Sequence, residues 1–355
     1  MSERHGALNT TELEALGVDA ERVLDMSSNC LPGRAHARVR RAAERAAIET
    51  YPSPDAAPLR ARLAACHGVP AAQVVAGAGA AQLIFAAVQA VTREGDTVLA
   101  VQPSFGEYLD AAQALRRRPL EVSVPLGAEP DLTEVFANVE RERPALVFVC
   151  QPNNPTGRLW PRAQLARLAA VCAETGGRLV VDHAYATFAD PTSRFDEVPA
   201  AINLYSLTKD YALAGLRLGY AVAQLDDAQA VHRVLPPWSV SAPAMAAGIA
   251  ALDPEVVVAT DAAIRAVRQS AEQLWTALRA RRAEVVPSDC HFALVRCPGA
   301  SAYRLRMLQQ CRVQVRSAAS FGLPGHIRVC SKGAGADALF LQAWDALGAN
   351  ASADL

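Results

Sequence analysis

The sequence Ser206-Leu207-Thr208-Lys209, followed after five residues by Gly215-Leu216-Arg217-Leu218-Gly219-Tyr220, carries the most information about this chain. A lysine amine can hold an aldehyde cofactor as an imine, while the Ser206 and Thr208 hydroxyls and the Arg217 guanidinium bind its phosphate. Residues 201–205 and 218–222 are apolar and predict buried strands on either side. The polar side chains therefore lie where a strand opens into a loop, a usual ligand site in α/β proteins, and they indicate pyridoxal 5'-phosphate chemistry.

Two further segments offer partners for the cofactor ring. Asn154 lies in the turn Gln151-Pro152-Asn153-Asn154-Pro155-Thr156-Gly157, and its amide can donate to a phenolic oxygen. Asp182 ends the apolar strand 178–181, where a buried carboxylate is costly unless it is paired. A pyridinium nitrogen would pair with it and keep the ring an electron sink. Tyr185 could reach the same phenolic oxygen as Asn154, so we predict Lys209, Asp182 and Tyr185 as catalytic residues.

The order of these motifs resembles a known family. Asn-Pro-Thr-Gly at 154–157, Asp-x-Ala-Tyr at 182–185, Ser-x-Thr-Lys at 206–209 and Gly-Leu-Arg-x-Gly-Tyr at 215–220 are similar to the fold type I pyridoxal phosphate enzymes of aminotransferase class I and II. Tyr51-Pro52-x-Pro54-Asp55 with Leu59-Arg60 resembles the branch that holds histidinol-phosphate aminotransferase and threonine-phosphate decarboxylase. Narrower likeness to the decarboxylase lies in His5-Gly6 and in residues 25–29, 103–108 and 237–240, and the resemblance runs from His5 to about Arg328.

The resemblance implies further contacts to the cofactor. Phe105 would stack on the pyridine ring, with Ala184 on the opposite face. The turn at Gly79 would offer backbone N–H groups to the phosphate at the start of a helix. Tyr51 would reach the phosphate in the neighbouring subunit, which implies a homodimer with shared active sites. The predicted cofactor-binding residues are Tyr51, Gly79, Ala80, Ala81, Phe105, Asn154, Asp182, Ala184, Tyr185, Ser206, Thr208, Lys209 and Arg217.

The same resemblance suggests how the substrate is held. Arg328 would bind its carboxylate as a bidentate pair, and His5 and Asn29 would line the distal end of the pocket. The chain departs from the decarboxylase pattern at Leu31, Ala78, Ala81, Gln82, His183 and Lys332. We expect a decarboxylase acting on threonine phosphate or a similar anionic amino acid. The alternatives are an aminotransferase of the histidinol-phosphate type, or a specialised-metabolism enzyme that catalyses elimination, replacement or carbon–carbon bond formation.

Strand and helix patterns alternate along the chain and predict an α/β fold. With the resemblance, this becomes a fold type I pyridoxal phosphate-dependent transferase, in which a large domain with a mainly parallel seven-stranded sheet is joined to a small α/β domain. We expect residues 1–45 to form an N-terminal arm and part of the small domain, 46–260 the large domain and 261–355 the C-terminal small domain. The boundary would lie in a long amphipathic helix at 254–282, and 313–316 would be one strand of the small domain.

The chain contains nearly equal numbers of basic and acidic residues, so its surface is expected to carry charges of both signs. A net charge of −1 gives no reason to invoke nucleic acid or a membrane. The sequence lacks an apolar run long enough to span a bilayer and an apolar N-terminal signal core, so we expect a cytoplasmic protein. Eight cysteines without a Cys-x-x-Cys pair and seven histidines without ligand spacing predict no metal and no disulfide. His67, His232 and His326 are interpreted as surface or loop residues.

Overall fold

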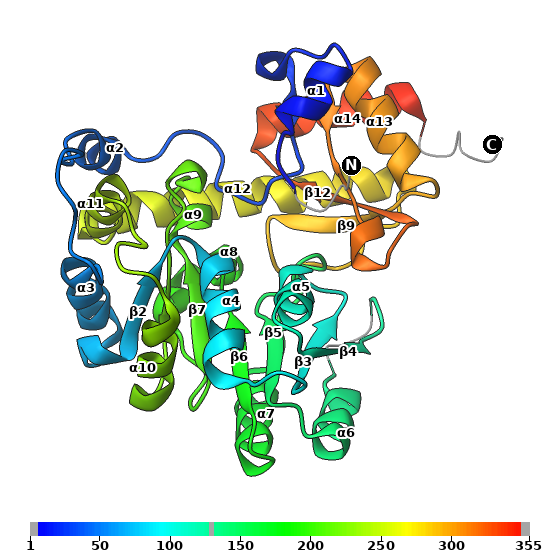
Figure 1. The fold of residues 1–355 in the computed structure, drawn as a ribbon. Coiled ribbons are helices and arrows are strands. Elements are labelled where there is room, and N and C mark those ends of the chain that lie inside the picture. Colours follow the sequence, from blue (N-terminus) through cyan, green and yellow to red (C-terminus); the bar gives the residue numbers. More distant parts are fainter. Residues whose placement is uncertain (1–5, 128–130, 349–355) are drawn as a thin grey trace.

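The protein is described here by a computed structural model, which covers residues 6–127 and 131–348. A large lobe holds the main sheet, a smaller lobe combines elements from both ends of the chain, and α12 (Pro254–Ala280) runs along both lobes (Figure 1). The other helices are α1 (Thr10–Ala15), α2 (Ala37–Glu44), α3 (Ala57–His67), α4 (Ala80–Val91), α5 (Glu107–Ala114), α6 (Thr133–Glu142), α7 (Arg162–Glu174), α8 (Ala186–Ala189), α9 (Leu207–Asp210), α10 (Leu225–Val234), α11 (Ala242–Ala251), α13 (Ala300–Cys311) and α14 (Ala334–Leu347).

The main sheet has seven strands in the order β2-β8-β7-β6-β5-β3-β4. They are β2 (Val74–Gly77), β3 (Thr97–Gln102), β4 (Arg118–Ser123), β5 (Leu146–Cys150), β6 (Arg178–Asp182), β7 (Ile202–Ser206) and β8 (Gly219–Val222). Strand β8 is antiparallel to both of its neighbours, and the other adjacent pairs are parallel. The predicted mainly parallel sheet is confirmed, and the strands expected at 178–181, 201–205 and 218–222 each start within one residue of the expected position.

Alternating side chains on the strands build a core on each face of the sheet. Val98 and Ala100 of β3 pack in the core that includes α4 and α5, whereas Leu99 and Val101 pack in the core that includes α6 and α7. This follows from the two-residue period of a strand. Both faces are covered by helices, so the strands are almost continuously apolar, as expected for a buried parallel sheet.

The smaller lobe holds two short sheets. Strands β11 (Arg316–Ser317), β12 (His326–Cys330) and β9 (Phe292–Arg296) are antiparallel, and β1 (Leu24–Asp25) is parallel to β10 (Val313–Gln314). The expectation of one strand at 313–316 is therefore wrong. The chain changes partner at Val315, from β1 on one side to β12 on the other, and that choice depends on distant segments rather than on local pattern.

Residues 6–45 contribute to both lobes. Leu13 of α1 packs against Leu308 of α13, whereas α2 packs against α11. Helix α12 also takes part in both: Val256 belongs to a large-lobe core, and Trp275 to the core of the small lobe. The exact three-part division of the chain stays a prediction.

Within the described residues, no single helix is long and apolar enough to cross a membrane. Helices α11 and α12 together meet that test of length and composition, but they are bent by 79° at the break between them.

The side chain of His67 is buried, which corrects its interpretation as a surface or loop residue. It ends α3, and its Nδ1 lies 2.7 Å from a Glu197 carboxylate oxygen while its Nε2 lies 3.1 Å from the Tyr220 hydroxyl. Burial lowers the pKa of His67 to about 4, so the ring is neutral at pH 7. Neither partner is near His67 in sequence, so local pattern gave no sign of them.

Candidate active site

The predicted catalytic side chains gather at the carboxyl edge of the main sheet. Asp182 is the last residue of β6, Ser206 the last of β7, and Lys209 lies in the short helix α9 that follows directly. Strands β6 and β7 are parallel and adjacent, so their carboxyl ends meet at one place. Ligands of open α/β sheets bind at this edge.

A cradle for a phosphate forms where α4 begins. Its N-cap is Gly79 (φ 87°), which has no side chain to cap the first turn, so the N–H groups of that turn can face an anion. A Cβ placed on Gly79 would lie 3.0 Å from Nη2 of Arg217, and one placed on Gly219 would lie 2.7 Å from the Ala80 nitrogen. The helix start and the arginine therefore approach each other closely.

Two hydroxyl groups lie where β7 ends and α9 begins. The Ser206 Oγ and Thr208 Oγ1 atoms lie 2.6 Å apart, both buried. Together with the Arg217 guanidinium and the open first turn of α4, they form a donor set suited to a phosphate monoester. Ala80 and Ala81 supply the first backbone positions of that turn.

Asp182 is buried and accepts two hydrogen bonds. The Tyr108 hydroxyl donates to Oδ2 at 2.8 Å, and the Ala184 N–H donates to Oδ1 at 3.0 Å. Burial raises the pKa of Asp182, and the hydrogen bonds from Tyr108 and Ala184 together with the nearby charge of Lys209 oppose that rise. A carboxylate held in this way can pair with a cationic ring nitrogen.

Asn154 and Tyr185 lie on either side of Arg328. The Arg328 Nη1 donates to Oδ1 of Asn154, which leaves the amide nitrogen as the available donor. Tyr185 is buried, its ring meets Phe292 edge-on with centroids 5.0 Å apart, and burial raises its pKa, so its phenol stays protonated. Two neutral donors, Asn154 and Tyr185, are thus available for one oxygen of a bound ring.

Phe105 and Ala184, predicted to cover the two faces of the cofactor ring, pack against the core, whereas Tyr51 is exposed. Phe105 is partly buried and packs edge-on against Tyr108, with ring centroids 5.8 Å apart, and Ala184 packs in the same core. Tyr51 is 80 % exposed, and its ring packs on Trp238 at 4.8 Å. Within one chain Tyr51 is therefore a surface residue.

At the substrate end, the structure adds an arginine that the sequence analysis missed. Arg316 of β11 stands directly opposite Arg328 of β12, and both are buried. Both guanidinium groups face the ring of Phe321, at 5.3 Å for Arg316 and 6.0 Å for Arg328. Arg316 ends the predicted strand 313–316, but only the strand pairing brings it beside Arg328.

The segment 27–31 runs between Arg328 and Lys209. The Ser27 carbonyl accepts from Arg328, and the Leu31 N–H donates to the Lys209 carbonyl at 2.8 Å. Asn29 is buried between them, and its side-chain amide has no hydrogen-bond partner among the described residues. The structure therefore brings Asn29 to the predicted substrate end.

Two other residues were singled out for this end of the pocket, Lys332 and His5. Lys332 does not extend freely into the pocket, because its Nζ is bonded to the Ser28 carbonyl at 2.6 Å and to the Cys30 carbonyl at 3.3 Å. His5 lies outside the described residues. Its neighbour Gly6 packs so closely on Arg328 that a Cβ there would collide with the guanidinium.

These residues fit pyridoxal phosphate. A phosphate cradle, a lysine, a buried carboxylate and two hydrogen-bond donors for the phenolic oxygen of the ring lie at one edge of the main sheet. The amino-acid sequence matches a family model for aminotransferase class I and II over residues 21–347. The chain belongs to that family, whose members are pyridoxal phosphate-dependent enzymes.

Named relatives and solved structures agree with this family assignment. A histidinol-phosphate aminotransferase from Chromobacterium violaceum is 38 % identical over 262 residues, covering 72 % of this chain and 71 % of the relative. The crystal structure of histidinol-phosphate aminotransferase from Sinorhizobium meliloti with pyridoxal-5'-phosphate has a TM-score of 0.84 at 22 % identity, covering 96 % of each chain, and supports the fold. L-threonine-O-3-phosphate decarboxylase from Porphyromonas gingivalis has a TM-score of 0.77 at 26 % identity, covering 91 % of this chain and 98 % of that one.

Proposed function

We propose that this enzyme is an aminotransferase of the histidinol-phosphate type, acting on an amino compound that carries a phosphate. The observation that carries the proposal is the pair of buried arginines, Arg316 and Arg328, on facing strands at the substrate end. A phosphate monoester bears up to two negative charges, and two guanidinium groups can bind it with several charge-assisted hydrogen bonds. The relatives named histidinol-phosphate aminotransferase favour this function over the decarboxylation expected from the sequence.

The roles we propose for the site residues follow from their positions. Pyridoxal phosphate, when bound, supplies an electron sink for bonds at the substrate's α-carbon. Lys209 would attach the cofactor and move the proton at that carbon, while the Asp182 carboxylate would accept a hydrogen bond from the protonated ring nitrogen. Asn154 and Tyr185 donate to the phenolic oxygen. The cofactor phosphate would be held by Ser206, Thr208, Arg217 and the first turn of α4 at Gly79, Ala80 and Ala81, and Phe105 and Ala184 would cover the two faces of the ring.

Decarboxylation of threonine phosphate is the second candidate. It is supported by the similarity to L-threonine-O-3-phosphate decarboxylase from Porphyromonas gingivalis. Asn29, whose buried amide lacks a partner among the described residues, is positioned to contact a phosphate at the same end of the pocket. The two reactions differ in what leaves the α-carbon, so their products separate them.

The test is a single-turnover assay on the holoenzyme with histidinol phosphate, histidinol, threonine phosphate and threonine. Conversion of bound cofactor to its pyridoxamine form and release of carbon dioxide are followed separately. We expect stoichiometric pyridoxamine form with histidinol phosphate and little with histidinol. Carbon dioxide from threonine phosphate without the pyridoxamine form would replace the proposal with decarboxylation. Lys209→Ala serves as the blank, because it should lose both the covalent cofactor and turnover.

The role of the arginine pair is tested in the same assay. Arg316→Lys keeps the charge but loses the planar fork, so we expect KM for histidinol phosphate to rise roughly tenfold. Reactivity with histidinol should be unaffected. Arg312→Lys, on an exposed residue between α13 and β10, is the matched control and should change neither value. A normal KM in folded Arg316→Lys would remove the support for a phosphorylated substrate.

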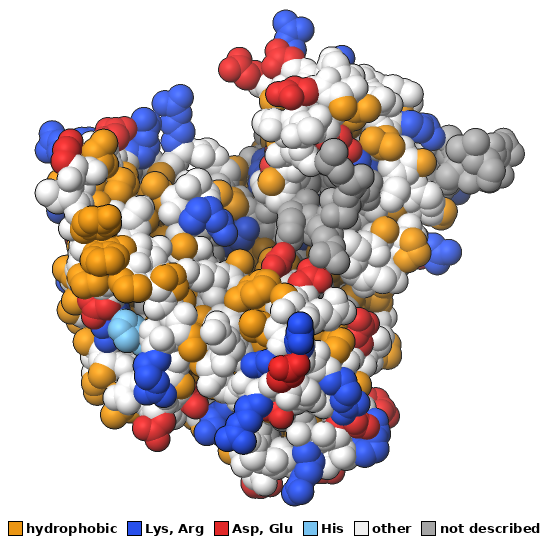
Figure 2. All heavy atoms as spheres, in the orientation of Figure 1, with side chains coloured by type: hydrophobic (Ala, Val, Ile, Leu, Met, Phe, Trp, Pro, Cys, Tyr) orange, Lys and Arg blue, Asp and Glu red, His pale blue; other side chains and the backbone are white. Residues whose placement is uncertain are grey.

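We further propose that the enzyme is a homodimer whose active sites are shared. Aromatic and aliphatic side chains stand exposed near the start of the large lobe: Ile48 is 77 %, Tyr51 80 % and Trp238 46 % exposed. Hydrophobic side chains also gather over the region of α2, α3 and α11 on the face shown in Figure 2. Such a patch is typical of an interface with a second copy. It would bring Tyr51 to the partner's phosphate site.

A further inference from the structure

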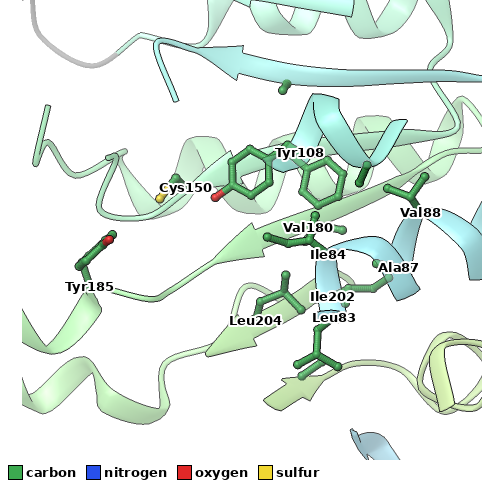
Figure 3. Close-up of a cluster of buried hydrophobic side chains, with 14 of the residues drawn as sticks. Leu83, Ile84, Ala87, Val88, Tyr108, Cys150, Val180, Tyr185, Ile202 and Leu204 are labelled. Atoms are coloured by element: carbon green, nitrogen blue, oxygen red, sulfur yellow. The ribbon is translucent and has the colours of Figure 1, made fainter. Parts of the chain in front are cut away.

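Tyr108 is a side chain that contacts the Asp182 carboxylate. It lies in α5, is fully buried, and its hydroxyl donates to Oδ2 of Asp182 at 2.8 Å. Figure 3 shows its oxygen directed toward Cys150, at the end of β5. In the sequence, residues 103–108 showed only a likeness to a family and the aromatic residue Phe105.

Neighbouring rings fix the direction of this hydroxyl. The Tyr108 ring stacks on Phe148 with centroids 4.8 Å apart and planes 7° apart, and it meets Phe105 at 83°. A close-packed aromatic side chain of this kind has no alternative rotamer without a cavity or a clash. The donor therefore stays on the Asp182 carboxylate whether or not a cofactor is bound.

The electrostatic surroundings keep Tyr108 a donor. Burial and the negative charge of Asp182 raise the pKa of Tyr108 well above 10, so its hydroxyl keeps its proton at working pH. Asp182, in contrast, would tend toward the neutral acid because of its burial. A hydrogen bond donated to its charged form opposes that tendency.

We propose that Tyr108 is a positioning residue that keeps Asp182 ionised and oriented, so that the proton shared with the cofactor resides on the ring nitrogen. The Tyr108 hydroxyl stabilises the carboxylate and disfavours the carboxylic acid. The same proton can sit on the nitrogen beside a carboxylate or on the carboxyl group beside a neutral pyridine. Tyr108 favours the first arrangement, in which the ring accepts electrons best.

A purely structural role would make the hydroxyl dispensable, because phenylalanine could fill the same space between Phe148 and Phe105. Tyr108→Phe is therefore the discriminating variant. The matched control is Tyr205→Phe, which removes another buried hydroxyl, bonded at 2.5 Å to the Asp196 carbonyl and outside the site. Both variants lose one oxygen and one hydrogen bond from the large-lobe core.

The first readout needs no cofactor. In apoprotein labelled with ¹³C at aspartate carboxyl groups, the Asp182 signal is identified by its loss in Asp182→Asn, and its titration is followed by NMR. Tyr108→Phe should raise the pKa of Asp182 by about one to two pH units, since a hydrogen bond to a charged group is lost. Tyr205→Phe should leave it unchanged. An unchanged Asp182 titration in folded Tyr108→Phe would overturn the proposal.

The second readout uses holoenzyme loaded with ¹⁵N-pyridoxal phosphate. The ring-nitrogen signal should move from the protonated toward the neutral position in Tyr108→Phe, with the ratio of the two forms changing about tenfold or more. If Tyr108→Phe does not fold, 3-fluorotyrosine at position 108 keeps the shape and strengthens the donor. It should lower the pKa of Asp182 in the apoprotein, and no shift there would equally contradict the role.

Discussion

His183 follows Asp182 directly, yet its side chain has a different environment. Its Nε2 lies 2.9 Å from Oδ1 of Asn203, and its ring stacks on Tyr205 at 5.1 Å. Successive residues at a strand end point to opposite sides, so the neighbour of a catalytic carboxylate can belong to the core behind it. The residue that departs from the family pattern at this position therefore belongs to the fold rather than to the cofactor site.

Burial lowers the pKa of His183 from 6.5 to about 4, which predicts a specific loss of stability in acid. The unfolded chain binds the proton first, so the stabilisation is complete above pH 6.5 and is lost as pH falls toward 4. His183→Gln keeps an amide donor for Asn203 and does not titrate. It should flatten the fall in unfolding free energy across this interval by on the order of 3 kcal/mol, measured by urea unfolding.

The control for this measurement is His232→Gln, because His232 is exposed on α10. Its replacement should leave the pH dependence as in the wild type. Equal slopes for His183→Gln and the wild type would mean that His183 is already charged in the folded protein.

Residues with a chemical signature in local sequence were predictable, and residues defined by pairing were not. Lys209 and Asp182 each stand at a strand end within a short motif, and the structure places them at one edge of the sheet. Arg316 becomes a candidate only through its register with Arg328, and Tyr108 only through its bond to Asp182. Such contacts join residues 12 and 74 positions apart, respectively, beyond the range of a local pattern.

At the scale of elements, the apolar strands of the main sheet were predictable because both faces are covered and each strand is a short apolar run between turns. The single strand expected at 313–316 was not predicted correctly, because residues 313–314 pair with β1 whereas residues 316–317 pair with β12. Short strands of the small lobe thus owe their limits to their partners. The start of α4 is a different case, in which one glycine on a neighbouring strand sets the geometry.

Gly219→Ala should weaken cofactor binding. Its Cβ would lie 2.7 Å from the Ala80 nitrogen and 2.9 Å from the Tyr205 carbonyl oxygen, and neither backbone atom can move without shifting α4 or β7. Displacing the first turn of α4 moves its N–H groups away from the phosphate, and each 1.4 kcal/mol lost costs a factor of ten in affinity. We expect at least a roughly tenfold increase in the dissociation constant, measured by titrating apoprotein with pyridoxal phosphate.

Gly215→Ala is the matched comparison, because a Cβ on Gly215 meets nothing within 4 Å. Gly215 lies in the connection between α9 and β8, four residues before Gly219, so it tests whether an alanine in this part of the chain is enough to disturb the site. Gly215→Ala should bind the cofactor normally. Equal affinities for the two variants would show that the approach of β8 to α4 does not control the phosphate cradle.

At the scale of the whole molecule, the two lobes depend on each other through α12, whose first turns pack with the large lobe and whose last turns pack with the small one. The long amphipathic pattern at 254–282 predicted this helix but not which residues face which lobe. The sequence likewise does not show what the exposed side chains of Tyr51 and Trp238 contact in an assembly of two chains. The two rings pack on each other, but Tyr51 is still mostly exposed to solvent.

Subunit mixing tests whether that outward face serves a partner. Tyr51→Ala and Lys209→Ala should each have little activity alone. In a mixed dimer, the site that keeps Lys209 would receive Tyr51 from the Lys209→Ala subunit and would be complete, while the other site would lack both. With equal amounts and random exchange, half of the dimers are mixed, and about a quarter of all sites should work, judged by turnover against wild type.

A second mixture decides whether recovery reflects sharing between subunits. Asp182 ends β6, and Lys209 lies in α9 directly after the adjacent strand β7 of the same chain. A mixed dimer of Asp182→Ala and Lys209→Ala therefore has a defect in both sites and should recover nothing. Differently tagged subunits establish that exchange has occurred in both mixtures. If exchange is complete and the Tyr51 mixture stays inactive, Tyr51 acts within its own chain or not at all, and the shared site is wrong even if the protein is dimeric. Recovery only in the Tyr51 mixture requires that one subunit complete the phosphate site of the other.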